Sequence, residues 1–171
     1  MKLPFLRKAT TGEEPLVVAM TGARLGEAVL FAGQSPALAL PLAARTGLSG
    51  RCLIVGVPEV TGRLAAAATR EGLLVETAAL PPGDATFDLA VIEATGDWSR
   101  AAAACRSAVR AGGRVIVVAG SAREGLVARL TRSPKESPAA DAIVRSLTDA
   151  GWQRARLIGE RDGLTFVEAF R

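Results

Sequence analysis

The chain alternates short runs of aliphatic and β-branched residues with longer segments in which apolar residues recur every three to four positions. The short runs predict strands at residues 28–32, 51–55, 73–77, 87–92 and 114–118. The periodic segments between them predict helices over residues 36–45, 58–71 and 98–111. Strands that alternate with helices in this way indicate βαβ units and a largely parallel sheet.

Residues typical of helix ends define the limits of these predicted helices more closely. Ser35 followed by Pro36 is typical of a helix start, whereas Pro41 lies inside the same segment and predicts a kink or an interruption. Gly72 is placed to end the next helix. Asp97 precedes the third helix in the position of a helix cap, and the glycines at 112–113 are expected to end it.

The C-terminal region follows a different pattern. After an irregular stretch at residues 120–138, one more helix is predicted with Ile143, Leu147 and Ala150 on its apolar face. Two strand-like runs at 152–160 and 164–170 are then joined by Arg-Asp-Gly, and Asp-Gly is a strong hairpin signal. No repeat or low-complexity linker divides the chain, so a single domain over residues 1–171 is expected.

The amino-acid composition excludes some kinds of catalytic site and metal site. The 171 residues include no histidine, which excludes histidine-based nucleophile triads, and only two cysteines, which exclude an all-cysteine zinc site. No metal site is therefore predicted. Cys52 falls in a strand and Cys105 on the apolar face of a helix, so both are expected to be free thiols in the core. The first residues lack the apolar core of a secretion signal, and we expect a soluble cytoplasmic protein without a membrane partner.

The net charge of +4 is unevenly distributed, since residues 97–171 hold 13 basic and 8 acidic side chains. A basic half could face a polyanion such as nucleic acid. However, the basic residues are interleaved with Glu124 and Glu136, and aromatic residues for base stacking are scarce. A solvated arginine-rich surface is the preferred interpretation, and no nucleic-acid partner is predicted.

Three stretches resemble the class I S-adenosylmethionine-dependent methyltransferases. Residues 26–33 are similar to the family's first strand and glycine-rich turn, residues 87–92 to its fourth strand, and residues 110–117 to the turn into its fifth. The final helix and hairpin match the family's ending. The resemblance implies an α/β, Rossmann-like fold with a seven-stranded, mostly parallel sheet, a C-terminal antiparallel hairpin and helices on both faces.

The resemblance also implies where S-adenosylmethionine would bind. The family reads Val-Leu-Asp-x-Gly-x-Gly-x-Gly after its first strand, and a second acid after its second strand holds the ribose. Here Phe31 stands in the place of the first acid and Pro58 in that of the second. Ser35 and Ala37 replace two glycines, so any need for a positive φ there would be strained. The predicted cofactor-binding residues are Gly33, Gln34, Ser35, Ala37, Val57, Pro58, Glu59 and Glu93.

Two functions stay open. The first is methyl transfer from S-adenosylmethionine to a small-molecule acceptor, a reaction that relies on positioning and needs no histidine. No catalytic residue is assigned, although Glu93 or Asp97 could serve as a base and Asp97 could instead only cap its helix. The second is a catalytically inactive relative that has lost the cofactor and binds a protein partner or another ligand. Residues 1–25 are expected to form an N-terminal extension, with a short helix over residues 13–21 that could act as a lid.

Two other nucleotide-binding motifs fit less well. A nicotinamide-binding Rossmann domain needs a Gly-x-Gly-x-x-Gly after a strand, and Gly33 has no second glycine in place. Gly56 and Gly62 have the spacing of a P-loop, but Arg63 and Leu64 replace the required Lys-Ser/Thr.

Overall fold

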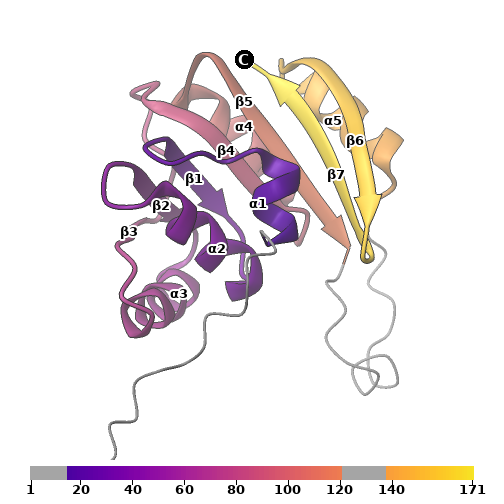
Figure 1. Ribbon diagram of the computed structural model, residues 1–171. Helices are drawn as coiled ribbons and strands as arrows, with labels where there is room; N and C mark the ends of the chain where they lie inside the picture. Colours follow the sequence, from indigo (N-terminus) through magenta and orange to yellow (C-terminus); the bar gives the residue numbers. More distant parts are fainter. Residues whose placement is uncertain (1–14, 121–137) are drawn as a thin grey trace, which may run out of the picture.

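A seven-stranded sheet organises the chain in the computed structural model, which describes residues 15–120 and 138–171 (Figure 1). The strand order is β3-β2-β1-β4-β5-β7-β6, in which β1 to β5 run parallel and β7 runs antiparallel to both neighbours. The strands are β1 (Ala28–Ala32), β2 (Arg51–Val55), β3 (Glu76–Ala78), β4 (Phe87–Glu93), β5 (Val109–Gly120), β6 (Gln153–Arg161) and β7 (Leu164–Phe170). The predicted sheet and its terminal hairpin are confirmed.

Helices cover both faces of the sheet, as predicted. They are α1 (Leu16–Thr21), α2 (Pro36–Thr46), α3 (Pro58–Arg70), α4 (Trp98–Ala108) and α5 (Ala140–Asp149). One core cluster joins α1, α2 and α3 to the side of the sheet that carries Phe31, Ile54 and Phe166. The other joins α4 and α5 to the opposite side, and in Figure 1 these two helices lie behind the sheet. In the part of the chain that the structure describes, no helix is long and apolar enough to cross a membrane.

The register brings the ends of non-adjacent segments to one edge. Ala32 pairs with Val55 of β2 and with Ile92 of β4, so these parallel strands all end at the same edge. The β6–β7 turn reaches this edge as well, because Leu164 pairs with Gly120 at the end of β5. Asp162 and Gly163 in that turn both have positive φ (53° and 80°), as a tight hairpin requires. Open α/β sheets bind ligands at this carboxyl edge.

Several predicted boundaries were wrong, including the start of the fifth strand, which was expected at residue 114 and lies at Val109. The third strand was expected at residues 73–77 but begins only at Glu76, because the N–H of Leu73 still donates to the Ala68 carbonyl at the end of α3 (2.9 Å). The helix expected to reach the glycines at 112–113 ends at Ala108, since Val109 is extended and pairs with Phe87. The residues from 110 to 113 then bulge out between two registers of β5.

Helix α2 is continuous through Pro41, so the predicted interruption does not occur. The surrounding positions Leu38, Ala39 and Leu42 are all buried, so packing against the sheet holds the helix together across the missing N–H. The short helix expected over residues 13–21 is α1, whose Val17 and Val18 are buried in the core. The irregular stretch at 120–138 lies, from 121 to 137, outside the described residues.

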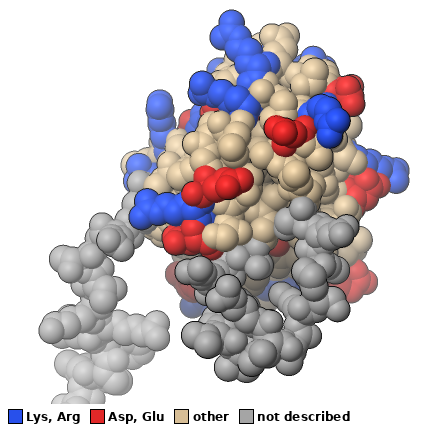
Figure 2. Space-filling model, turned by 90° about the vertical axis from the view of Figure 1, so that its right-hand side faces the viewer, with Lys and Arg blue, Asp and Glu red and all other residues tan. Residues whose placement is uncertain are grey.

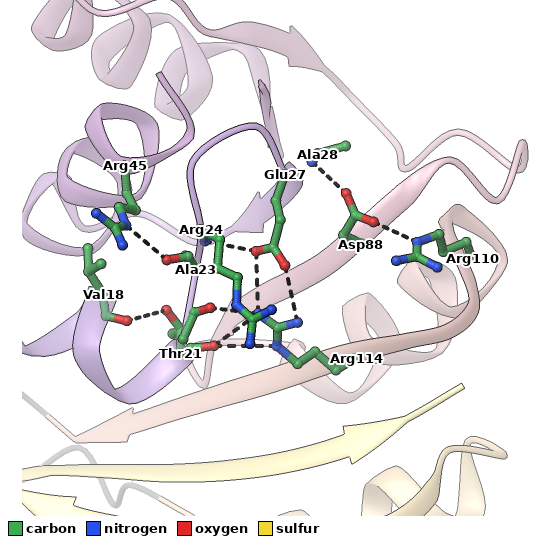
Figure 3. A network of polar contacts seen from close by, with 11 residues as sticks. Val18, Thr21, Ala23, Arg24, Glu27, Ala28, Arg45, Asp88, Arg110 and Arg114 are labelled. Carbon is green, nitrogen blue, oxygen red and sulfur yellow. Dashed lines mark hydrogen bonds and ion pairs between the residues drawn. The ribbon is translucent and has the colours of Figure 1, made fainter. Parts of the chain in front are cut away.

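A polar network at the opposite, amino edge of the sheet fixes α1 (Figure 3). The Arg114 guanidinium on β5 donates to the Gly22 carbonyl just after α1 (2.9 Å) and to the Thr21 carbonyl (3.4 Å). It also forms an ion pair with Glu27 (3.4 Å), whose second contact is the Arg24 N–H (2.9 Å). The guanidinium thus satisfies carbonyls that the end of a helix leaves without partners.

A second carboxylate joins β1 to β4 at this edge. Asp88 accepts the N–H of Ala28 (2.8 Å) and the Arg110 guanidinium (2.6 Å). Burial by itself would raise the pKa of Asp88, but these two contacts and the nearby charge of Arg114 together more than offset it, and the pKa lies below its ordinary value. Asp88 is therefore ionised at neutral pH and positions the first residue of β1.

Replacing Arg114 by methionine is expected to lower the free energy of unfolding by about 2 kcal/mol, because it leaves Glu27 and the α1 carbonyls without their partner. The Arg114 and Glu27 side chains are only 20% and 17% exposed. Arg110→Met is the matched control, since Arg110 is 56% exposed and its loss should cost less than about 1 kcal/mol. Urea denaturation of both variants measures the difference; equal losses would contradict this role of Arg114.

Candidate functional site

The turn after β1 is held by a carboxylate from β4. The backbone N–H groups of Gln34 and Ser35 both donate to Oε2 of Glu93, at 2.6 and 3.0 Å. Glu93 ends β4, and the pairing of Ala32 with Ile92 places it beside Gly33. Four of the predicted cofactor-binding residues, Gly33, Gln34, Ser35 and Glu93, therefore meet at one point of the carboxyl edge.

Only glycine fits at position 33, because the neighbouring atoms leave no space for a Cβ. A Cβ there would lie 2.7 Å from the Cβ of Glu93, 2.8 Å from its Oε2 and 2.7 Å from Cζ of Phe31. The strain predicted for residues with a side chain in this turn does not arise, because Ser35 has a φ of −84° and Ala37 lies within α2. Glycine is needed for close approach, not for an unusual backbone angle.

Phe31 occupies the position that the family gives to an acid. Its side chain is fully buried in the cluster that includes Leu38, Leu64 and Val91, and the end of its ring faces Gly33. The carboxylate at this turn comes instead from the neighbouring strand, through Glu93. Because Phe31 and Val91 are paired and Glu93 follows Val91 by two residues, Glu93 lies on the same side of the sheet as Phe31.

The residues after β2 form a separate group at the same edge. Val57 precedes α3, Pro58 is its first residue, and Glu59 lies exposed in its first turn. Within the described ranges, no hydrogen bond or ion pair joins these three residues to the turn that Glu93 holds. The N–H of Gly56 donates to the Ala78 carbonyl (3.1 Å), which keeps the ends of β2 and β3 together.

Apolar side chains are exposed next to these strand ends. Val57 is 59% exposed after β2, and Leu80 is 76% exposed after β3. Ligand sites combine apolar surface with a few polar groups. Both follow the ends of the neighbouring strands β2 and β3, and Val57 lies two residues before Glu59.

Ala37 faces a different hollow, of about 380 Å³, that sequence reasoning missed. It is lined by α1, the first turn of α2 and the β6–β7 hairpin, through Pro15, Leu16, Val17, Ala37, Leu38, Asp162 and Leu164. The Asp-Gly turn in the sequence could have indicated this hollow. Because β7 runs antiparallel beside β5, the turn that precedes β7 must lie at the carboxyl edge. Ala37 therefore does not join the cluster around Glu93.

Asp97 and the two cysteines, the other candidate residues, make contacts within the fold. Asp97 stands at the cap position of α4 as predicted, but its carboxylate accepts the Ser99 hydroxyl (3.4 Å) and makes no bond to the helix N–H groups. Burial raises the pKa of the Cys52 and Cys105 thiols to about 12, which confirms their predicted core role. Among the residues that the structure describes, no group of three acidic or cysteine side chains could hold a metal ion.

Comparisons with known proteins identify the fold. The sequence matches no family profile and no curated protein. Among solved structures, the chain is similar to a SAM-dependent methyltransferase from Aquifex aeolicus, with a TM-score of 0.69 and 19% identity over 90% of this chain and 86% of that one. It is also similar to a SAM-dependent O-methyltransferase from Thermotoga maritima (TM-score 0.65, 15% identity, 91% and 63%) and to the [4+2]-cyclase SpnF (TM-score 0.66, 18% identity, 91% and 78%).

The chain has the class I S-adenosylmethionine-dependent methyltransferase fold. Identities of 15 to 19% in these three structures establish the fold alone, and SpnF is a reminder that one fold carries different chemistries. The chain spans most of the Aquifex protein but about half the length of several others, including 53% of SibL and 55% of an O-methyltransferase from Nostoc punctiforme.

The groups at the methyltransferase-fold edge fit S-adenosylmethionine in kind, although not at the family's usual positions. Oε1 of Glu93 makes no hydrogen bond to a described residue, so a carboxylate oxygen is available for a cationic group. The exposed Glu59 carboxylate can accept from ribose hydroxyls, one residue after Pro58. Val57 and Leu80 offer apolar surface for an adenine ring. Gly33 allows the turn to pack directly against Phe31 and Glu93.

Proposed function

We propose that this protein binds S-adenosylmethionine at the carboxyl edge of β1, β2 and β4 and transfers its methyl group to a small-molecule acceptor. The observation that carries the proposal is the turn at Gly33, where the side chains of Phe31 and Glu93 leave no room for a Cβ and Glu93 supplies the carboxylate that Phe31 lacks. PigF, another similar structure, was solved with SAH, which supports this ligand class for the fold.

The chain's own residues would bind and orient the two reactants. Glu93 would hold a cationic group, Glu59 the ribose hydroxyls, and Val57 with Leu80 the adenine ring. When bound, S-adenosylmethionine supplies an electrophilic methyl group, so the protein must mainly position the acceptor and exclude water. The hollow lined by Ala37 and the β6–β7 turn opens at the same edge and is the place proposed for the acceptor.

A small molecule is a better proposed acceptor than nucleic acid. On the face that carries β6 and α5, basic and acidic side chains are interleaved (Figure 2). Arg156 pairs there with Glu168 (2.9 Å), and Arg161 lies 3.9 Å from Asp162. Such mixed charge provides no continuous positive surface for a phosphate backbone. We likewise propose a cytoplasmic location and no membrane partner.

Isothermal titration with S-adenosylmethionine and S-adenosylhomocysteine tests the proposal. We expect saturable binding in the micromolar range, and binding about 10-fold or more weaker in Glu93→Gln, because the neutral amide loses its charge-assisted contact. Glu71→Gln is the control, since Glu71 is exposed at the far end of α3 and should not affect binding. No heat with millimolar ligand would refute cofactor binding.

The second candidate is a catalytically inactive methyltransferase-fold protein that binds a partner or another ligand. The specific observation in its favour is that the Gln34 and Ser35 N–H groups, which a cofactor could use, are already bonded to Glu93. Phe31 in the core and Pro58 after β2 point the same way. The same titration decides between the two candidates, because only the first requires binding of S-adenosylmethionine.

A further inference from the structure

Helices α2 and α3 lie next to each other (Figure 1). A groove runs between the first turn of α2 and one side of α3, and it shares only Gln34 with the cluster around Glu93 among the described residues. Its volume is about 630 Å³, within the range of small-molecule sites. The lining residues are Gln34, Pro36, Arg63, Leu64, Ala66, Ala67, Thr69 and Arg70. The proposed methyl transfer assigns no role to Arg63 and Arg70, the two charged residues of this groove.

The groove combines apolar walls with unpaired positive charge. Pro36 and the two alanines provide the exposed apolar surface, and the buried Leu64 lies at its base. Arg63 and Arg70 are both exposed, and within residues 15–120 and 138–171 neither makes an ion pair or a hydrogen bond. No acidic residue is among the described residues that line the groove. An anion is therefore the complementary ligand.

The spacing of the two arginines sets the shape of that ligand. They are seven residues apart on α3, which is two helical turns on one side and about 10 Å along the axis. The small side chains of Ala66 and Ala67 lie between them and leave the groove open. A ligand that reaches both guanidinium groups must carry two anionic ends and an apolar chain that crosses the alanines.

The remaining polar side chains of the groove are consistent with an anion. The side-chain amide of Gln34 makes no hydrogen bond to a described residue, so its N–H donors are available. The Thr69 hydroxyl, in contrast, donates to the Ala65 carbonyl (2.9 Å) and completes the helix. Three donor groups, Arg63, Arg70 and Gln34, thus face one apolar groove.

We propose that the groove between α2 and α3 binds an elongated small molecule with a carboxylate at each end and an apolar middle. The arginines bind the two carboxylates, and Pro36 with the alanines packs against the apolar chain. This binding site goes beyond the proposed methyl transfer and needs no cofactor, so it can be tested on the protein alone.

Isothermal titration with sebacate, a ten-carbon dicarboxylate, tests the site, with decane-1,10-diol as the uncharged probe of the same length. We expect sebacate to bind saturably at one site and the diol not to bind. Arg63→Gln and Arg70→Gln should each weaken binding about 2- to 5-fold, within the range expected for exposed charge pairs. Ala66→Glu should abolish binding, because its carboxylate would lie between the two arginines on an exposed helix position.

Arg100→Gln is the matched control, since Arg100 is an exposed arginine on α4, which packs on the other face of the sheet. Unchanged sebacate binding in Arg100→Gln, together with weaker binding in the two groove variants, supports the site. Absence of saturable binding, equal binding of the diol, or equal weakening in Arg100→Gln would each overturn it.

Discussion

The variant Phe31→Asp, which restores the family's acid, is expected to unfold the protein instead of improving its cofactor site. Phe31 is fully buried in the core under α1, α2 and α3. Removing a buried phenylalanine side chain costs about 3–5 kcal/mol, and a buried carboxylate without a partner adds to that loss. We expect a loss of about 4 kcal/mol or more, which is a large fraction of the roughly 5–15 kcal/mol by which a typical domain is stable.

Urea denaturation followed by far-ultraviolet circular dichroism measures this loss, with Phe31→Leu as the conservative control. Leucine keeps most of the apolar volume, and its cost should stay below about 1.5 kcal/mol. A folded Phe31→Asp protein that binds S-adenosylmethionine more tightly than the wild type would contradict this assignment. It would mean that the core tolerates the acid and that Glu93 does not replace it.

Gly33→Ala is expected to disrupt the site and the fold together. The added Cβ would lie 2.7–2.8 Å from atoms of Phe31 and Glu93, so the packed ring or the bonded carboxylate must move. Forcing a group into a packed position costs about 1–3 kcal/mol. Displacement of Glu93 would also release the Gln34 and Ser35 N–H groups. We expect lower stability and weaker binding of S-adenosylmethionine in the same variant.

Gly62→Ala provides the matched control for this substitution. Gly62 lies inside α3, and a Cβ there would meet no atom within 4 Å. Alanine should stabilise the helix by about 0.5–1 kcal/mol, because glycine is the poorer helix former. Denaturation midpoints of the two variants should therefore move in opposite directions. If Gly33→Ala were as stable as the wild type, the close packing at the turn would be refuted.

The elements that sequence predicted well are those decided by local signals. The bounds of β1 and β2 follow from short aliphatic runs, and the Asp-Gly turn at 162–163 defines the hairpin. The boundaries that failed depend on distant partners. Val109 leaves its helix to pair with Phe87, and β3 begins at Glu76, whose carboxylate binds the Arg51 guanidinium on β2 (2.8 Å).

The candidate site was predictable only in outline. Placing Gly33, Gln34, Ser35 and Glu93 at one edge follows from the parallel order of the strands, which the sequence indicates. The bonds from the turn to Glu93 depend on the register between β1 and β4, a non-local property that no sequence pattern specifies. The groove between α2 and α3 depends equally on how two helices pack.

The two buried cysteines have a practical consequence for following motions of this protein. Cys52 lies in β2 on the side near α2 and α3, whereas Cys105 lies on α4 behind the sheet. A thiol that is buried and protonated reacts with disulfide reagents only after its surroundings open. The rate of thiol labelling at Cys52 therefore measures how often one side of the sheet opens in the native protein. The rate at Cys105 measures the same for the other side.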